Sequence, residues 1–483
     1  MSFRSYDRTV DADGMPGMTL ENIARACEGT YVGSEALYRE CITGIEIDSR
    51  KVSRGCLFVP IKGARVDGHD FIPQVMEQGA MATLTERPLK DAKGPYILVD
   101  STTDALKAIA AFYRRNLDIK VVGITGSVGK TSTKEMIASV LEQKFEVLKT
   151  AGNFNNEIGL PLTIFQIRRK HEVAVLEMGI SDFGEMSRLA KMANPDICVI
   201  TNIGLCHLEN LGTRDGILKA KTESFDYLTP NGIAVLNGDD DKLCTKQLVN
   251  EKPPVFYGMG STSKCESGLN NQIYLSDIEN LGFEGNKALF HTPAGDFEAW
   301  VKIPGEHNLY NAMAAAAVGL ELGLTLDEIK AGIETGKTIA GRTNFLHLGD
   351  VTVIDDCYNA NPVSMAASLD VLSYGNGRTI AVLGDMGELG AEEEKLHREV
   401  GKVVGEKKIE VLFAAGKLAR EYVEGAKETE PLCDTHYYEN LEAMLPELLS
   451  FVKPGDNILV KASHFMDFPQ VVKNLESTFA EQC

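Results

Sequence analysis

The sequence predicts an α/β protein built from three domains. First, 483 residues are too many to fold around a single core. Second, short apolar runs alternate with helix-like segments from about residue 119, and this alternation restarts at residue 341. Third, the block before residue 117 differs from this pattern, because it mixes short strand-like runs such as CLFVPI and YILV with helix-like stretches. We therefore expect domains over 18–117, 118–340 and 341–483, preceded by a loose polar extension over residues 1–17.

The composition excludes several classes of protein. A net charge of −20 disfavours a protein that coats nucleic acid or an anionic membrane, since both would repel it. No run of 18 apolar residues is present, and the polar N-terminus lacks the apolar core of a signal peptide. The ten cysteines include no C-x-x-C pair, which argues against a zinc ribbon. We expect a cytoplasmic protein that does not insert into membranes.

The stretch VVGITGSVGKTSTKEM, residues 121–136, resembles a phosphate-binding loop with altered spacing. The usual loop has a glycine six residues before its lysine, but Ile124 occupies that place before Lys130. An apolar strand-like run precedes the glycines, and a helix is expected from about Thr131. A helix N-terminus attracts anions, and Gly126 and Gly129 allow close backbone approach. The alternative is a glycine-rich turn that contains Gly-Lys-Thr without binding phosphate.

Two polar residues follow apolar runs in the same region. Glu177 ends VAVLE and His207 follows ICVITNIGLC, so both are expected where strands end at the edge that faces a nucleotide. Glu177 is interpreted as a magnesium ligand; the alternative is a carboxylate at an exposed strand end. His207 is interpreted as a ligand or as an ordinary structural histidine.

Lys219 and Lys221 lie near the start of a helix-like segment, in LGTRDGILKAKTESF. A lysine ammonium would repel a metal, but an uncharged amine can capture carbon dioxide as a carbamate, whose two oxygens suit magnesium. Capture requires a pKa lowered by burial or by nearby positive charge. Spacing alone does not separate this hypothesis from two surface lysines.

Several motifs, taken together and in order, resemble the Mur ligases of peptidoglycan synthesis. They are GITGSVGKTST, GNFNNEIGLPLT, VLEMG, TNIGLCHLE, KAKTESF, GEHNLYNAMAA, GRTN, DDCYNANPVSM and LGDMGELG. The last two resemble the branch that adds D-alanyl-D-alanine. The resemblance implies a domain that binds the UDP substrate, a central ATPase domain of the P-loop type with a parallel sheet, and a C-terminal Rossmann-like domain.

The resemblance also implies roles for individual residues. The residues expected to bind ATP are Thr125, Gly126, Ser127, Val128, Gly129, Lys130, Thr131, Asn308, Asn311, Arg342 and Asp356. Asn308 and Asn311 would lie near adenine, Arg342 near the γ-phosphate and Asp356 near the ribose. The metal ligands would be Thr131 and Glu177 for one magnesium, and His207 and carbamylated Lys221 for a second. Catalysis would depend on Lys130, Glu177, His207 and Lys221. The residues that contact the UDP substrate or position groups in the active site would be Ser49, Arg50, Asn153, Asn156, Asn359 and Asn361.

The implied reaction joins UDP-MurNAc-tripeptide and D-Ala-D-Ala at the expense of ATP, through an acyl phosphate, in a monomeric enzyme with no nucleic-acid partner. Its product would serve cell-wall synthesis and, through it, cell shape and division. The alternatives are another Mur or folylpolyglutamate-type ligase, or a P-loop kinase or NTPase. One departure from the family pattern is His464 in KASHFM, where arginine is expected, because histidine lacks the two-pronged guanidinium.

Overall fold

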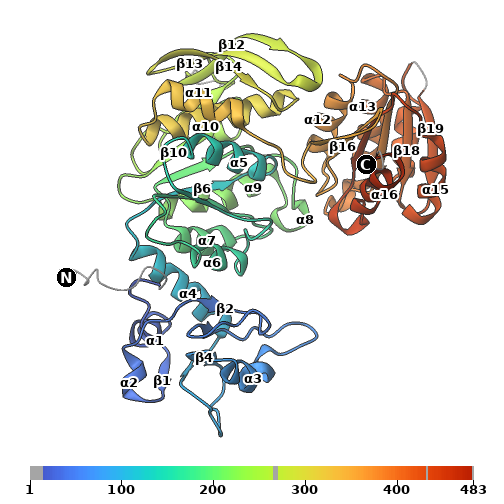
Figure 1. Ribbon diagram of the computed structural model, residues 1–483. Coiled ribbons are helices and arrows are strands. Elements are labelled where there is room, and N and C mark those ends of the chain that lie inside the picture. The colour runs from blue at the N-terminus through green and yellow to red at the C-terminus, as the bar shows by residue number, and fades with distance from the viewer. Residues whose placement is uncertain (1–14, 265–269, 431–432, 481–483) are drawn as a thin grey trace.

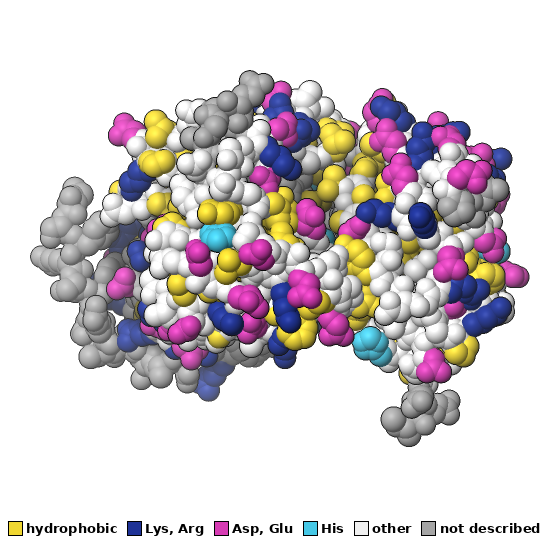
Figure 2. Space-filling view, turned by 90° about the horizontal axis from the view of Figure 1, so that it is seen from above, with side chains coloured by type: hydrophobic (Ala, Val, Ile, Leu, Met, Phe, Trp, Pro, Cys, Tyr) yellow, Lys and Arg dark blue, Asp and Glu magenta, His cyan; other side chains and the backbone are white. Residues whose placement is uncertain are grey.

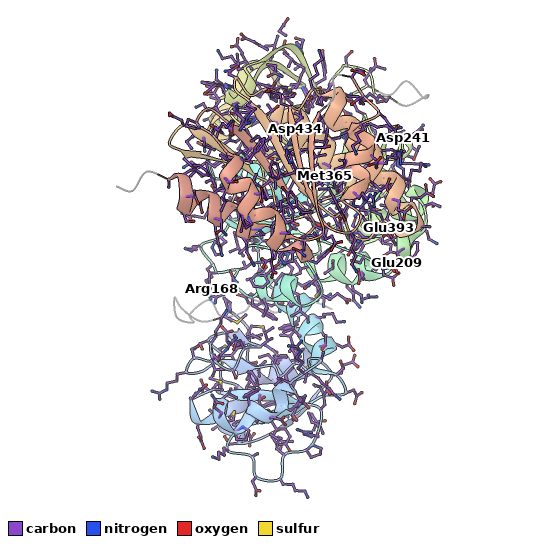
Figure 3. The ribbon with its side chains drawn as sticks, turned by 90° about the vertical axis from the view of Figure 1, so that its right-hand side faces the viewer. Arg168, Glu209, Asp241, Met365, Glu393 and Asp434 are labelled. Carbon is purple, nitrogen blue, oxygen red and sulfur yellow. The ribbon has the colours of Figure 1, made fainter. Side chains whose placement is uncertain are left out.

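The computed structural model describes residues 15–264, 270–430 and 433–480, and these residues form three sheets with helices packed on them. Figure 1 shows the N-terminal unit below the central one and the C-terminal unit beside it. Seen from the side, the C-terminal unit, which carries Met365 and Asp434, lies in front of the central unit (Figure 3). The predicted α/β fold with mostly parallel sheets is therefore confirmed.

The N-terminal unit has a small five-stranded sheet in the order β1-β5-β4-β3-β2, parallel except for the β1–β5 pair. Its elements are α1 (Leu20–Ala26), β1 (Thr30–Val32), α2 (Glu35–Tyr38), β2 (Ile45–Glu46), β3 (Leu57–Phe58), α3 (Ile72–Glu77), β4 (Ala82–Thr85), β5 (Tyr96–Leu98) and α4 (Thr102–Arg115). Most of the predicted loose extension, residues 1–14, lies outside the described residues. Met15 is fully buried, and its N–H bonds to the carbonyl of Ile42.

The central unit has a nine-stranded sheet in the order β14-β13-β12-β11-β10-β9-β6-β8-β7. The seven strands from β6 to β12 are parallel, and an antiparallel β12-β13-β14 meander extends one edge. Its strands are β6 (Lys120–Thr125), β7 (Val147–Lys149), β8 (Val173–Glu177), β9 (Ile197–Ile200), β10 (Ile233–Asn237), β11 (Val255–Gly258), β12 (Ile273–Asn280), β13 (Asn286–Thr292) and β14 (Gly295–Val301). Its helices are α5 (Lys130–Leu141), α6 (Gly159–Ile164), α7 (Glu185–Ala193), α8 (Leu208–Leu211), α9 (Arg214–Thr222), α10 (Glu306–Glu321) and α11 (Leu326–Thr335).

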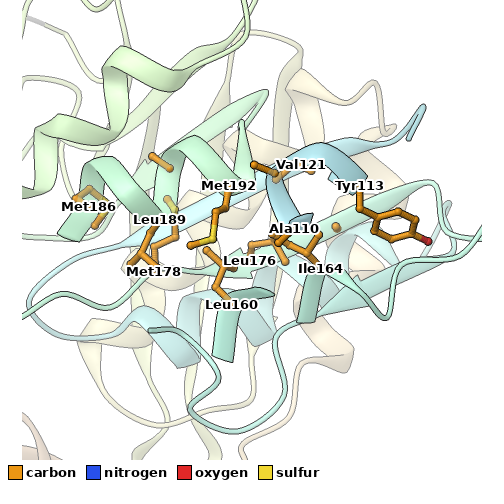
Figure 4. Packing of buried hydrophobic residues seen from close by; sticks show 14 of the residues in the cluster. Ala110, Tyr113, Val121, Leu160, Ile164, Leu176, Met178, Met186, Leu189 and Met192 are labelled. Atoms are coloured by element: carbon orange, nitrogen blue, oxygen red, sulfur yellow. The ribbon is translucent and has the colours of Figure 1, made fainter. Parts of the chain in front are cut away.

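One continuous core joins the N-terminal and central units. Helix α4 packs against α6 and α7, and Figure 4 shows Ala110 and Tyr113 among side chains such as Ile164, Leu176 and Met192. The α4 pattern of buried Leu106, Ile109, Ala110 and Tyr113 follows helical spacing. Because α4 packs against α1 of the N-terminal unit as well as against α6 and α7, it couples the two units rather than acting as a loose linker.

The C-terminal unit is a doubly wound six-stranded sheet in the order β15-β16-β20-β17-β18-β19, parallel except for the β15–β16 hairpin. Its strands are β15 (Asn344–Leu348), β16 (Val351–Asp355), β17 (Thr379–Gly384), β18 (Val411–Ala415), β19 (Asp434–Tyr438) and β20 (Asn457–Lys461). Its helices are α12 (Pro362–Leu372), α13 (Glu393–Glu406), α14 (Arg420–Ala426), α15 (Leu441–Phe451) and α16 (Pro469–Phe479). Among the described residues, no helix is long and apolar enough to cross a membrane.

Candidate active site

A cleft of about 840 Å³ lies between the central and C-terminal units and is lined by residues of both. Viewed from above, hydrophobic side chains gather where the two units meet (Figure 2). The cleft lies beyond the carboxyl ends of β6, β8 and β9, which is where open α/β sheets bind ligands. The region that the sequence indicated for a phosphate site therefore forms one wall of the cleft.

The glycine-rich loop connects β6 directly to α5, as its sequence predicts. Gly129 has a φ of +81°. Within the part of the chain that the structure describes, no side chain caps the first turn of α5, so N–H groups at this helix end remain available to an anion. Asn202 fixes the loop from the side: its carbonyl accepts from the N–H of Ser127 (3.0 Å) and its Oδ1 from that of Val128 (3.0 Å). Thr125 lies at the end of β6 and is fully buried, and its Oγ1 has no hydrogen-bond partner among the described residues.

Gly126 leaves no room for a side chain, because an added Cβ would stand 1.9 Å from Thr201 Oγ1. That hydroxyl donates to the carbonyl of Val128 (2.6 Å), so a clash there disturbs the loop itself. We expect Gly126→Ala to raise the KM for ATP or lower kcat at least tenfold and to cost about 1–3 kcal/mol of stability. Steady-state kinetics and urea unfolding measure the two effects.

Gly323→Ala is the control, since Gly323 also has a positive φ (+78°) but no atom of the described residues lies within 4 Å of the added Cβ. It should be strained without loss of activity. Unchanged kinetics in Gly126→Ala would contradict the assignment of this loop to phosphate binding.

Lys130 begins α5 and reaches back over the loop, where its Nζ donates to the carbonyl of Gly126 (2.9 Å). Burial lowers the pKa of Lys130, the Glu177 carboxylate opposes that shift, and the Arg342 guanidinium adds to it. Arg342 comes from the link between the central and C-terminal units, and its guanidinium lies 4.1 Å from the Tyr358 ring centre. The structure thus brings two cations from different parts of the chain to one cleft.

Glu177 ends β8 and exposes only 1% of its surface. Its Oε2 accepts from Thr131 Oγ1 (2.9 Å) and its Oε1 from Asn155 Nδ2 (2.8 Å). Its N–H donates to Thr150 Oγ1 (3.0 Å). Asn155 is a site residue that sequence reasoning missed. Asn155 lies between Asn153 and Asn156, the two asparagines of GNFNNEIG that were expected in the site. Only the fold shows that Asn155 is the one that bonds to Glu177.

His207 lies in the cleft just before α8, and its Nδ1 is 2.7 Å from Glu388 Oε2 of the C-terminal unit. This hydrogen bond from His207 is the main reason that the pKa of Glu388 lies below its usual range. Glu388 belongs to the LGDMGELG motif. The contact links the two walls of the cleft, and within the described residues it is the only polar partner of the His207 ring.

Lys219 and Lys221 lie in the last turn of α9, not near its start as expected, because Thr213 caps a helix that begins at Arg214 and ends at Thr222. Lys219 is exposed, with its Nζ 5.8 Å from the ring centre of Phe183. Lys221 exposes 1% of its surface. Burial and the neighbouring Lys130 ammonium lower the pKa of Lys221 to about 7. Within the described part of the chain, its Nζ has no hydrogen-bond or ion-pair partner.

Asn308 and Asn311 lie in the first turns of α10 and are largely buried. Asn311 donates to Asn308 Oδ1 (2.9 Å) and accepts from Thr133 Oγ1 (2.7 Å), so it connects α10 to α5. Asn311 lines the cleft, whereas Asn308 donates to the carbonyl of Pro304 (2.8 Å) and is not among the residues that line the cleft.

On the C-terminal wall, Asp356 is nearly buried and forms an ion pair with Lys461, whose Nζ lies 2.6 Å from Asp356 Oδ2. Asn359 is exposed in the cleft and accepts from Lys461 through its carbonyl (3.2 Å). Asn361 caps α12, where its Oδ1 accepts from the N–H of Ser364 (2.9 Å). The ion pair of Lys461 with Asp356 was not predicted, although Lys461 is the first residue of the KASHFM segment discussed above.

The other predicted substrate residues are not all at the cleft. Asn156 lines it and accepts from the N–H of Gly159 (2.8 Å) at the start of α6. Asn153 is exposed and outside the cleft lining. Ser49 and Arg50 lie in the N-terminal unit, where the exposed Arg50 pairs with Asp48 (2.8 Å). That pairing lowers the pKa of Asp48 to about 2.

Three family models match successive parts of the chain. The Mur ligase family catalytic domain matches residues 41–114, the Mur ligase middle domain matches 124–319, and the Mur ligase glutamate ligase domain matches 341–464. The matches follow one another in the order of the three sheets.

Individual relatives match over nearly the whole chain. The UDP-N-acetylmuramoyl-tripeptide–D-alanyl-D-alanine ligase of Bacillus subtilis is 38% identical, covering 95% of this chain and 98% of that protein. A crystal structure of MurF from Acinetobacter baumannii superposes with a TM-score of 0.85 at 32% identity, covering 95% and 99% of the two chains. MurF of Thermotoga maritima in complex with ADP gives 0.78 at 32% identity, covering 90% and 97%. On this evidence the chain belongs to the Mur ligase family.

Proposed function

We propose that this chain is an ATP-dependent ligase that joins D-alanyl-D-alanine to UDP-MurNAc-tripeptide, giving UDP-MurNAc-pentapeptide for peptidoglycan synthesis. The observation that carries the proposal is the meeting of Lys130 and Arg342 over a helix N-terminus, in a cleft between two domains. A local cluster of cations in a protein of net charge −20 indicates a site for a strongly anionic ligand such as ATP. The similarity to ligases of this name over nearly the full length supplies the substrates.

The alternatives explain less of the chain. A P-loop kinase or NTPase would account for the central domain, but not for a match that extends over 95% of the residues. A folylpolyglutamate-type ligase would leave the N-terminal domain without a purpose.

The N-terminal domain is where we propose that Ser49 and Arg50 contact the uridine nucleotide. We take 18–117, 118–340 and 341–483 as the three domains.

The residues at the cleft fit a magnesium ion held mostly by its substrates. Within the described residues, no group of three or more histidine, cysteine, aspartate or glutamate side chains could hold a metal. Magnesium is commonly bound through one or two protein ligands, with phosphate and water oxygens completing the shell. Thr131 Oγ1 and Glu177, which touch each other at 2.9 Å, would supply these ligands. Bound there, the ion would neutralise charge on the phosphate oxygens.

We further propose that Lys221 carries a carbamate. Its amine is buried and has no partner among the residues that the structure describes. A pKa of about 7 leaves much of the amine uncharged at neutral pH and able to react with carbon dioxide. Lys219, in contrast, is exposed to solvent, which favours Lys221 as the carbamylated residue. The carbamate and the Nε2 of His207 would hold a second magnesium.

The remaining groups have roles in phosphoryl transfer. In the first step, a carboxylate oxygen of the tripeptide attacks the γ-phosphorus of ATP, and the bond to ADP breaks. In the second, the amine of D-Ala-D-Ala attacks the acyl carbon, loses a proton and expels phosphate. Lys130 and Arg342 would stabilise the charge on the transferred group. Asn155 and Thr131 hold Glu177 in one orientation. No side-chain nucleophile is required.

A trapping experiment tests the order of these steps. With ATP, magnesium, UDP-MurNAc-tripeptide and hydroxylamine, and without D-Ala-D-Ala, we expect a hydroxamate of the tripeptide, because hydroxylamine intercepts an acyl phosphate. Mass spectrometry detects the product. If neither the hydroxamate nor positional isotope exchange in ATP is found, the proposed order is wrong.

We also propose that the enzyme works as a monomer in the cytoplasm, where its nucleotide substrates are made. Both walls of the cleft come from one chain, so no second copy is needed to complete the site.

A further inference from the structure

The link between the central and C-terminal domains, residues 341–343, is held by the segment that follows β16. The N–H of Gly341 donates to Asp355 Oδ2 (2.7 Å), and the N–H of Thr343 donates to Asp356 Oδ1 (3.1 Å). The carbonyl of Gly341 accepts from the N–H of Tyr358 (3.2 Å). Arg342, between these anchors, has its guanidinium on the Tyr358 ring.

The backbone of this link has positive φ angles on both sides of Arg342, which glycine adopts freely at 341 but which strain the chain at Thr343. Gly341 has a φ of +78°, and Thr343, a β-branched residue, has a φ of +46°. A β-branched residue at positive φ is a true outlier and persists only where surrounding contacts enforce it. The hydrogen bonds to Asp355 and Asp356 are such contacts, because each accepts from an N–H beside Arg342.

Asp355 exposes only 6% of its surface and has no cationic partner within the described residues. Among the described residues, the other hydrogen bonds to its carboxylate come from its neighbour Cys357, whose Sγ donates to Asp355 Oδ1 (2.9 Å). A buried carboxylate without a cation is costly, so its place at the end of β16 requires a reason. The hydrogen bond that its carboxylate accepts from the Gly341 N–H provides such a reason.

We propose that Asp355 and Tyr358 are positioning residues that fix the interdomain link and thereby direct Arg342 into the cleft. Asp355 fixes the backbone of the link by accepting a hydrogen bond from the Gly341 N–H, and the Tyr358 ring packs against the guanidinium of Arg342. The ring of His464 packs beside Tyr358, with ring centres 5.9 Å apart, and so extends this support. The catalytic consequence rests on the proposed function, since it requires Arg342 to meet the γ-phosphate.

Limited trypsin digestion of the full chain tests the link without any substrate. Trypsin can cut after Arg342 and after Lys337, and threonine follows both residues, so the two bonds form a matched pair. Lys337 is exposed and lies outside the anchored segment, whereas Arg342 is half-buried. The wild-type protein should therefore be cut after Lys337 well before it is cut after Arg342, as read by mass spectrometry of the fragments.

Asp355→Ala and Tyr358→Leu should each raise the rate of cleavage after Arg342, relative to Lys337, by about tenfold or more, since each removes an anchor. Asp355→Asn keeps an acceptor for Gly341, and Tyr358→Phe keeps the ring, so both should retain most of the protection. Wild-type cleavage ratios in both Asp355→Ala and Tyr358→Leu would overturn the proposal.

Asp456→Ala controls for general loss of stability. Asp456 is also buried, in the same domain, and is paired with Arg378 (2.7 Å), but it makes no hydrogen bond or ion pair with residues 341–343. It should leave the cleavage ratio unchanged, and an equal rise in this variant would also overturn the proposal. In kinetics, Tyr358→Leu should lower kcat more than it raises the KM for ATP, with rescue by Tyr358→Phe. A normal kcat in Tyr358→Leu, together with altered proteolysis, would disprove the proposal that the link positions Arg342 for catalysis. It would not disprove the ligase activity itself.

Discussion

Lys130→Ala should lower kcat by about 10²–10³-fold, because one electrostatic contact with a developing charge commonly contributes about 2.7–4 kcal/mol. Among the described residues, the Nζ of Lys130 bonds only to carbonyls of its own loop, so its loss should cost about 1 kcal/mol of stability or less. Steady-state turnover and urea unfolding of the purified variant separate the two effects.

Lys144→Ala is the matched control. Its Nζ also donates to a main-chain carbonyl, that of Gly323 (2.6 Å), but on the surface and away from the cleft. It should retain wild-type turnover. A near-normal kcat in Lys130→Ala would mean that the glycine-rich stretch is only a turn.

Lys221→Ala should lose activity by at least about 10²-fold, comparable to the loss of one electrostatic group at a reacting centre. If the lysine acts as a carbamate, acetate should restore part of this rate, because its oxygens can replace those of the carbamate. Lys221→Arg retains a cation and should stay inactive. ¹³C-labelled bicarbonate should give a carbamate signal in the NMR spectrum of the wild type that is absent from Lys221→Ala.

The opposite pattern would contradict the carbamate. Rescue of Lys221→Ala by an alkylamine, or full activity of Lys221→Arg, would show that the residue works as an ammonium. Lys219→Ala serves as the neighbouring control and should keep its activity, since Lys219 is exposed. If Lys219→Ala were instead the variant that acetate rescues, the chemistry would stand and the choice of lysine would be wrong.

The parts of the site that follow from local pattern were predictable. Lys130 stands at a strand–loop–helix junction and Glu177 at the end of an apolar run, and parallel strands bring such positions to one edge. The strand VAVLE ends at Glu177 in the structure as well. The alternation of strands and helices likewise predicted the sheets of the central and C-terminal domains.

Contacts between distant segments were not predictable in the same way. The hydrogen bond from Asn155 to Glu177 joins residues 22 positions apart, and that from Gly341 to Asp355 joins residues 14 apart. Both depend on how loops settle around the sheets, which no local period encodes. The burial of Met15 was missed for a related reason, since a polar neighbourhood conceals one apolar side chain that fills a core.

The most direct test of the ligase assignment is release of phosphate from ATP with each substrate omitted in turn. The account predicts release only when UDP-MurNAc-tripeptide and D-Ala-D-Ala are both present, with one pentapeptide formed for each phosphate. Release that continues at the same rate without either substrate would contradict it, and would identify the protein as an NTPase on a Mur ligase fold.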